Sequence, residues 1–102
     1  MKSGYKVLWT DHALEEFSQT FKYLELNFSE KEISRLAHQI ESALRYISKY
    51  PKLYPESSRQ EGVRRAVIAK FNTLYYRVNI DKNRIEILSF FSNREDPGKL
   101  EF

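Results

Sequence analysis

The sequence contains no cysteine. This absence excludes disulfide bonds, thiolate metal sites and cysteine nucleophiles, and it is compatible with a reducing compartment. The N-terminus lacks the apolar run of a signal peptide, and no stretch approaches the roughly 18 apolar residues that a membrane helix needs. We therefore expect a cytoplasmic protein that is neither secreted nor inserted into a membrane.

Glycine and proline are scarce, with three residues of each. The isolated glycines form no Gly-rich phosphate loop. The two histidines, His12 and His38, have no second ligand at metal-binding spacing. No serine is marked as a nucleophile by a neighbouring base. We expect no metal and no cofactor.

The residues that are abundant predict one globular domain. The chain of 102 residues is 41% hydrophobic and 15% aromatic, and a domain of this size buries about two-thirds of its unfolded surface. We expect a single domain over residues 1–102. Residues 1–58 carry 8 Lys/Arg and 8 Asp/Glu, whereas residues 59–102 carry 9 and 6, so the net charge of +3 comes from the C-terminal part. This asymmetry suits a nucleic acid or an acidic protein segment, and a solvated basic face explains it equally well.

Hydrophobic periodicity predicts a strand and two helices in the first half of the chain. Alternating apolar residues indicate a short strand over residues 5–9, and apolar residues at helical spacing then indicate an amphipathic helix over residues 10–26. A capping box formed by Ser29 and Glu32 starts a second helix, which continues to about residue 48. The short break between the helices predicts an antiparallel hairpin.

Three β-rich runs follow a polar loop: Val63–Ile68, Thr73–Val78 and Arg84–Phe91. Turn residues separate them, so they predict a three-stranded antiparallel meander. The predicted fold is therefore α+β, in the order β-α-α-β-β-β. The helix hairpin packs on one face of a small, mainly antiparallel sheet and leaves the other face free for function.

The candidate functional residues are cations interleaved with aromatic residues on this sheet. Tyr75 and Arg77 should lie on the open face, because the residues that alternate with them form the better core set. In the first strand of the meander the two alternating sets are comparably apolar, and we favour Arg64 facing outward over Arg65. A purely structural explanation exists for each residue. Arg64 or Arg65 could pair with Glu86 across the sheet, Arg77 could be a solvated strand residue, and Tyr75 could cover an apolar edge. The complete set of candidates for target or RNA binding is Arg64, Arg65, Tyr75, Arg77, Glu86, Phe91 and Arg94.

Four segments, in this order and spacing, resemble the RelE/ParE family of toxins, to which plasmid stabilisation proteins of the ParE type belong. They are VLWTDHALEEF, YISKYPKLYPES, GVRRAVIAKFNTLYYRV and RIEILSFFSNREDP. The resemblance extends from Val7 to about Pro97. It implies the same β-α-α-β-β-β fold, a cytoplasmic bacterial protein and a cognate antitoxin that wraps its C-terminal segment around the toxin.

The resemblance also implies one of two activities. RelE-like members are ribosome-dependent mRNA endoribonucleases, whereas ParE-like members inhibit growth by binding DNA gyrase. The ribonuclease members place basic groups, and often a tyrosine or histidine, on the open face and the C-terminal tail. Arg64 and Arg94 fall where family cations fall.

This chain departs from the ribonuclease pattern at several positions. Ala66 follows Arg64 at the next outward position, Thr73 stands where a RelE-like member has arginine, and Leu100 stands where the tail would carry an aromatic hydroxyl. Arginines are always charged and make poor general bases, which leaves Glu86 or Tyr75 for that role. We therefore predict a ParE-like toxin that binds a protein target, with the RelE-like ribonuclease as the alternative.

Overall fold

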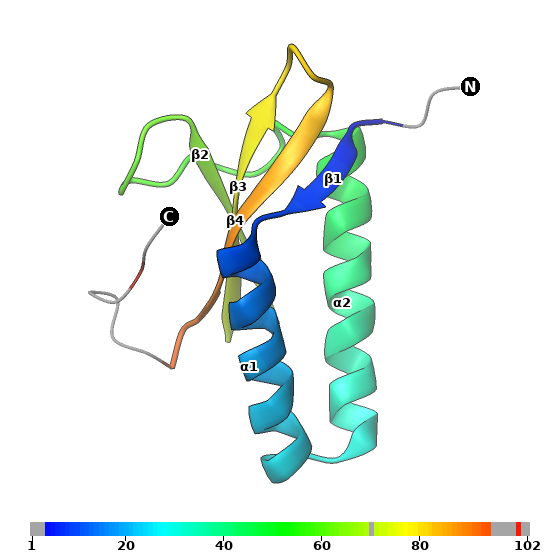
Figure 1. Cartoon of the computed structure of the whole chain (residues 1–102). Helices are drawn as coiled ribbons and strands as arrows, with labels where there is room; N and C mark the ends of the chain where they lie inside the picture. Colours follow the sequence, from blue (N-terminus) through cyan, green and yellow to red (C-terminus); the bar gives the residue numbers. More distant parts are fainter. Residues whose placement is uncertain (1–3, 70, 95–99, 101–102) are drawn as a thin grey trace.

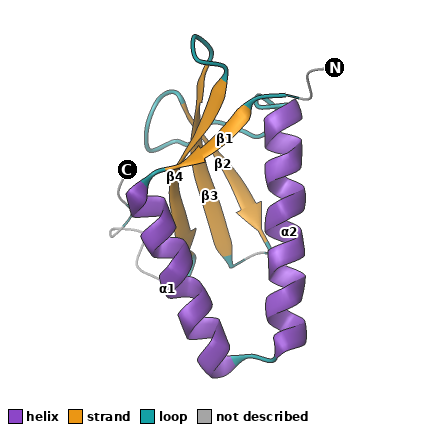
Figure 2. Ribbon diagram, turned by 45° about the vertical axis from the view of Figure 1, so that its right-hand side comes forward, coloured by secondary structure: helices purple, strands orange, loops and turns teal. Residues whose placement is uncertain are grey.

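The computed structural model describes residues 4–69, 71–94 and 100, and it consists of a helix hairpin that covers one face of a sheet (Figures 1 and 2). The order of elements confirms the predicted β-α-α-β-β-β fold. The elements are β1 (Lys6–Trp9), α1 (Asp11–Asn27), α2 (Glu30–Lys49), β2 (Val63–Ile68), β3 (Asn72–Asn79) and β4 (Arg84–Ser92).

The sheet has four strands in the order β1-β4-β3-β2. The last three strands form the predicted antiparallel meander, and β1 pairs with β4 in parallel, from Lys6 opposite Arg84 to Trp9 opposite Ile87. The pairing of β3 with β4 is shifted by a bulge between Tyr75 and Tyr76. The first and last strands of the chain therefore lie side by side (Figure 1).

The two helices begin where their caps predict. The Thr10 hydroxyl accepts a hydrogen bond from the Ala13 N–H at 3.2 Å. Ser29 and Glu32 form the reciprocal capping box, with the Glu32 carboxylate 3.0 Å from the Ser29 N–H. Each cap satisfies backbone N–H groups that the first helical turn leaves without an intrahelical partner.

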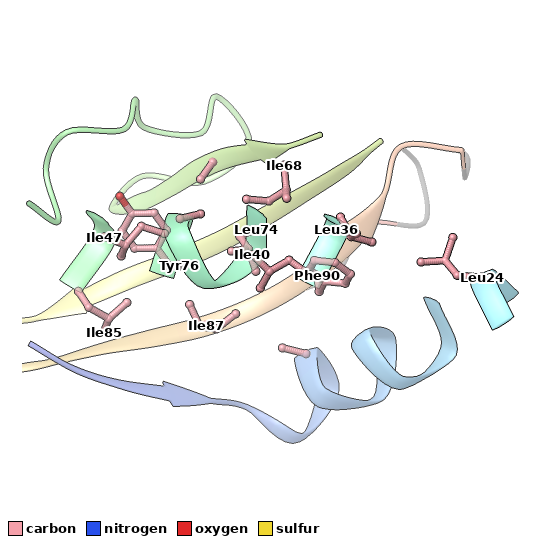
Figure 3. Packing of buried hydrophobic residues seen from close by; sticks show 13 residues of the cluster. Leu24, Leu36, Ile40, Ile47, Ile68, Leu74, Tyr76, Ile85, Ile87 and Phe90 are labelled. Carbon is pink, nitrogen blue, oxygen red and sulfur yellow. The ribbon is translucent and has the colours of Figure 1, made fainter. Parts of the chain in front are cut away.

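The core lies between the helices and the sheet (Figure 3). Ile40 and Ile47 of α2 pack there with Leu74 and Tyr76 of β3 and with neighbouring apolar residues of β4. Tyr76 is fully buried, and its hydroxyl donates a 2.7 Å hydrogen bond to the Pro51 carbonyl. This burial raises the pKa of Tyr76 to about 12.

The N-terminal end of β1 is joined to the end of α2. The Tyr5 N–H donates to the Ser48 carbonyl at 2.9 Å, and the Ser48 hydroxyl donates back to the Tyr5 carbonyl at 2.6 Å. Gly4 precedes this pair with a φ of +145°, and a Cβ at Gly4 would lie 2.5 Å from the Ser48 carbonyl oxygen. Only glycine fits this close approach without movement of the backbone.

The half of β4 beyond β1 is covered by α1. One oxygen of the Glu16 carboxylate accepts hydrogen bonds from the Phe90 N–H at 2.9 Å and from the Ser89 hydroxyl at 2.7 Å. Because β1 ends at Trp9, it offers no backbone carbonyl to the Phe90 N–H, and the Glu16 carboxylate accepts this hydrogen bond in its place.

The face of the sheet opposite the core is covered in part. Phe91 and Thr73 pair across β3 and β4 on this face, and both are buried. Val63 of β2 is also fully buried although it lies outside the core cluster. The expectation that this face is entirely free is therefore wrong.

Candidate partner-binding surfaces

The open face carries an ion cluster at its exposed end, near the β3–β4 turn. Arg77 and Glu86 lie opposite each other in β3 and β4, as the strand alternation predicts for Arg77. The Arg77 guanidinium donates to one Glu86 oxygen at 2.8 and 3.1 Å, and Arg84 donates to the other at 3.1 Å. Two cations thus share one carboxylate, which leaves a net positive charge.

The two arginines determine the ionisation of Glu86. The hydrogen bond from Arg77 is the largest effect and holds the pKa of this carboxyl below its usual value. Burial opposes this shift, and a hydrogen bond from Arg84 lowers the pKa further. A carboxylate in this state binds protons too weakly to act as a general base near neutral pH. The pairing of Glu86 with Arg64 or Arg65 that we considered is therefore wrong, because its partner across the sheet is Arg77.

Arg64 and Arg65 take the opposite faces from those we favoured. Arg64 is opposite Tyr76 in the sheet, on the side of the core, whereas Arg65 is opposite Tyr75 on the open face. The Arg64 guanidinium donates to the Tyr54 carbonyl at 2.7 Å and lies 3.7 Å from the Glu56 carboxylate. Arg64 therefore anchors the loop that follows α2, and the prediction that it faces outward is wrong.

The reason for this correction lies in Val63. Its side chain is fully buried on the face of Arg65, so both faces of β2 carry apolar residues and hydrophobicity alone does not distinguish them. Ala66, which we expected on the open face after Arg64, is fully buried in the core cluster instead.

Phe91 and Arg94 do not form one exposed surface with the other candidates. Phe91 is 5% exposed, which removes it as a stacking contact for a partner. Arg94 lies among aromatic rings, 4.5 Å from the Phe71 ring centre and 5.6 and 5.8 Å from those of Tyr23 and Phe28. Such cation–π contacts fix the position of a guanidinium.

With Phe91 removed, the six remaining candidates divide into three groups. Arg65, Tyr75, Arg77 and Glu86 share the open face, Arg64 anchors a loop, and Arg94 lies beside the tip of the helix hairpin. Thr73 is buried on the open face and its hydroxyl donates to the Asn93 side chain at 3.0 Å. Leu100 is buried as well.

Sequence reasoning missed a groove beside Arg94. It has a volume of about 270 Å³, and its lining includes Leu24, Phe28, Leu36 and Phe71. Asn72 also lines it, and among the described residues the buried Asn72 amide nitrogen has no hydrogen-bond partner. The signal in the sequence was weak, because these residues come from four separate elements or turns.

Two further grooves follow the helices. One, of about 730 Å³, lies between the outer side of α2 and the edge strand β2, with Lys31 and Arg35 on one side and Val67 on the other. The second, of about 420 Å³, lies between α1 and α2 and is mainly apolar, with Leu14 and Leu44 in its lining. Both are open surfaces next to the hairpin.

The part of the chain that the structure describes has no group of three His, Cys, Asp or Glu side chains placed to hold a metal ion. His12 lies 3.4 Å from Glu16 in α1, and His38 lies 4.0 Å from Glu41 in α2. No helix among the described residues is long and apolar enough to cross a membrane.

A match to a protein-family model identifies the family to which this fold and its surfaces belong. The model for the ParE toxin of the type II toxin–antitoxin system parDE matches residues 7–97. The chain belongs to the ParE toxin family. The match covers all six structural elements except the first residue of β1. A search of curated protein sequences finds no match.

Solved structures share the ParE-like fold. A chain of the chromosomal ParDE system from P. aeruginosa is similar with a TM-score of 0.71 and 14% identity, over 89% of this chain and 98% of that one. A chain of the toxin–antitoxin complex RelBE2 from Mycobacterium tuberculosis is similar with a TM-score of 0.61 and 22% identity, over 87% and 98%. At these identities the similarity shows the fold alone.

Proposed function

We propose that this ParE-family toxin is a cytoplasmic growth inhibitor that binds a protein target of the DNA gyrase class and is neutralised by a cognate antitoxin. The observation that carries the proposal is the state of Glu86. Its carboxylate is held by Arg77 and Arg84 with a lowered pKa. Among the candidates on the open face, the arginines stay charged and Glu86 stays ionised, so this surface is better suited to binding than to proton transfer.

The target contacts in this proposal are the exposed cations of the open face and the hairpin tip. Arg65 and Arg77 are exposed on the sheet, and Arg94 is exposed beside the hairpin with its guanidinium positioned by three rings. Tyr75 lies between Arg65 and Arg77 on the same face and is half-buried. An acidic surface on the target would complement this arrangement.

The antitoxin in this proposal is acidic and amphipathic. The groove between α2 and β2 offers cations, and the groove between α1 and α2 offers apolar residues such as Leu14, which is 48% exposed. An acidic segment with one apolar face would cover both. A neighbouring reading frame for a small protein with a DNA-binding head and such a tail would support this pairing, and its absence would count against it.

One experiment separates the two activities. The protein is induced without its antitoxin, and DNA breakage and mRNA fragmentation are followed in the same cells. Gyrase-linked breaks with intact mRNA are the expected result. Cleavage of mRNA at ribosomes would instead select the RelE-like ribonuclease, and normal growth with neither effect would contradict both.

Substitutions then locate the target surface. Arg65→Glu combined with Arg77→Glu should abolish growth inhibition, because it reverses the charge of the open face. Lys22→Glu, on the exposed side of α1, is the matched control and should leave inhibition intact. Arg94→Ala should weaken inhibition, and full toxicity of that variant would remove Arg94 from the site.

A further inference from the structure

A basic and aromatic segment ends α2. Of the six residues described next, Tyr46 also lines the groove between α2 and β2 that the proposed function gives to the antitoxin, and the other five lie outside its lining. Residues 42–55 contain three cations and three tyrosines and no acidic residue. The six residues Arg45, Tyr46, Lys49, Tyr50, Lys52 and Leu53 are all exposed, and we call them the α2-end patch. The end of α2 lies opposite the tip of the helix hairpin (Figure 1), so the patch is separate from the groove beside Arg94.

Helix geometry places the three patch residues of α2 on the side of the helix that faces away from the core. Arg45, Tyr46 and Lys49 lie three and four residues apart and therefore share one side of the helix. Ala43 and Ile47, on the other side, are buried. A hollow of about 360 Å³ is lined by Ser42 and by the first four residues of the patch.

The large side chains of the patch are more than half exposed. Tyr46 is 55% exposed, Tyr50 56% and Leu53 62%. Aromatic rings normally contribute most when buried, so an exposed group of them marks an interaction surface more often than a solvated one.

The cations of the patch have no acidic partner among the described residues. The ion pairs there join other residues, and the nearest acid along α2, Glu41, lies beside His38. Lys49 is in the last turn of α2 and complements the helix dipole. That effect falls off within one turn, so it does not account for Lys52 or for the exposed tyrosines.

We propose that the α2-end patch binds single-stranded nucleic acid. Unpaired cations attract the phosphate backbone, and exposed rings one helical turn apart provide faces on which bases stack. An acidic peptide without apolar side chains would use the cations and leave the tyrosines without a contact. The chemistry is shared by DNA and RNA, since both present phosphates and base faces.

The test measures binding by the full chain, prepared by cell-free synthesis so that growth inhibition does not limit its production. Fluorescein-labelled oligo(dT) and oligo(U) are titrated by anisotropy over a series of salt concentrations, beside a duplex of the same length. We expect both single strands, or one of them, to bind more tightly than the duplex. The comparison of the two identifies DNA or RNA as the preferred source.

Substitutions distinguish stacking from charge. Tyr46→Ala with Tyr50→Ala should weaken binding about tenfold or more, and Tyr46→Phe with Tyr50→Phe should retain it, because phenylalanine keeps the ring. Arg45→Glu with Lys49→Glu should weaken binding and lower the slope of log K against log salt by about one unit or more. Lys22→Glu is the matched control, and circular dichroism verifies that each variant is folded.

Three results would overturn the proposal. The first is that neither oligonucleotide binds, and the second is that the Tyr46→Ala, Tyr50→Ala variant binds with unchanged affinity. The third is that poly-glutamate binds as tightly as the oligonucleotides and is weakened equally by these two alanine substitutions. The last result would assign the patch to an acidic protein. None of these measurements depends on DNA breakage or mRNA fragmentation. Nucleic-acid binding by the patch can therefore be disproved while the proposed growth inhibition stands, and the proposed growth inhibition can be disproved while the patch still binds nucleic acid.

Discussion

Arg77 and Glu86 face each other across β3 and β4, with the Arg77 Nη2 atom 2.8 Å from the Glu86 Oε1 atom. The Arg77 side chain is 51% exposed and that of Glu86 is 15% exposed. Arg84 contacts the second carboxylate oxygen. The arginine side of this pair is therefore open to solvent, and the carboxylate side is enclosed. Substitution of Glu86, which both arginines contact, should consequently affect the stability of this cluster more than substitution of either arginine.

The acid dependence of stability should follow Glu86. Because its folded pKa lies below the usual value of 4.5, Glu86 contributes stability above that value, and the contribution is lost as the pH falls through the folded pKa. Glu86→Gln should cost about 1 kcal/mol or less near neutral pH and should lose less stability on acidification. Urea unfolding at a series of acidic pH values measures this, and identical acid profiles for the two proteins would contradict it.

Arg64 and Arg65 should have opposite phenotypes. Arg64→Ala removes the hydrogen bond to the Tyr54 carbonyl and should destabilise the fold by about 1–2 kcal/mol, while growth inhibition per folded molecule is retained. Arg65→Ala, on the open face, should change stability little and weaken inhibition. Urea unfolding and growth assays of both variants test the pair, and a reversal of the two phenotypes would return Arg64 to the target surface.

Alkaline stability should depend on Tyr76. Its folded pKa of about 12 exceeds the usual value of 10.0, so it contributes stability below pH 10 that is lost as the pH rises through the folded pKa. Tyr76→Phe removes this alkaline loss. It also leaves the Pro51 carbonyl without its partner, which costs about 1 kcal/mol at neutral pH. Unfolding followed from neutral to strongly alkaline pH should show a flatter profile for the variant, and parallel profiles would refute the assignment.

The two described glycines with positive φ should differ in their tolerance of alanine. Gly4→Ala would place a Cβ 2.5 Å from the Ser48 carbonyl oxygen, whereas Gly62, with a φ of +82°, has nothing within 4 Å of a Cβ. We expect about 1 kcal/mol of backbone strain at Gly62. Gly4→Ala should lower the free energy of unfolding by more than this, because the hydrogen-bonded link between Tyr5 and Ser48 must open to admit the Cβ. Thermal unfolding of the two variants compares them directly, and an equal loss would show that the contact with Ser48 is not needed.

Most of the fold could be predicted because local signals agreed. The Thr10 cap and the Ser29–Glu32 capping box determined both helix starts, and the predicted helix ends differ from the observed ones by one residue. The strand β2 matches its predicted bounds, Val63–Ile68. Each of these signals acts over a few neighbouring residues, which a sequence displays directly.

The candidate site could be predicted only in part, because the rest depends on distant contacts. The face of Arg64 depends on the loop carbonyl at Tyr54, ten residues away. The position of Arg94 depends on rings at Tyr23, Phe28 and Phe71, which only the tertiary fold brings together. Tyr75 and Arg77 were placed correctly, since a central strand with one clear core face leaves no ambiguity.

The edges of the sheet limit how another chain can attach. Along β4 the Glu16 carboxylate already occupies the Phe90 N–H. Along β2 the Arg65 N–H is bonded to the Pro55 carbonyl and the Val63 carbonyl to the Ser57 N–H, which leaves only the end of the strand around Val67. A strand added there would form a ladder of very few rungs. Along β2 and the part of β4 beyond β1, a partner chain must therefore derive its selectivity mainly from side-chain contacts rather than from backbone pairing.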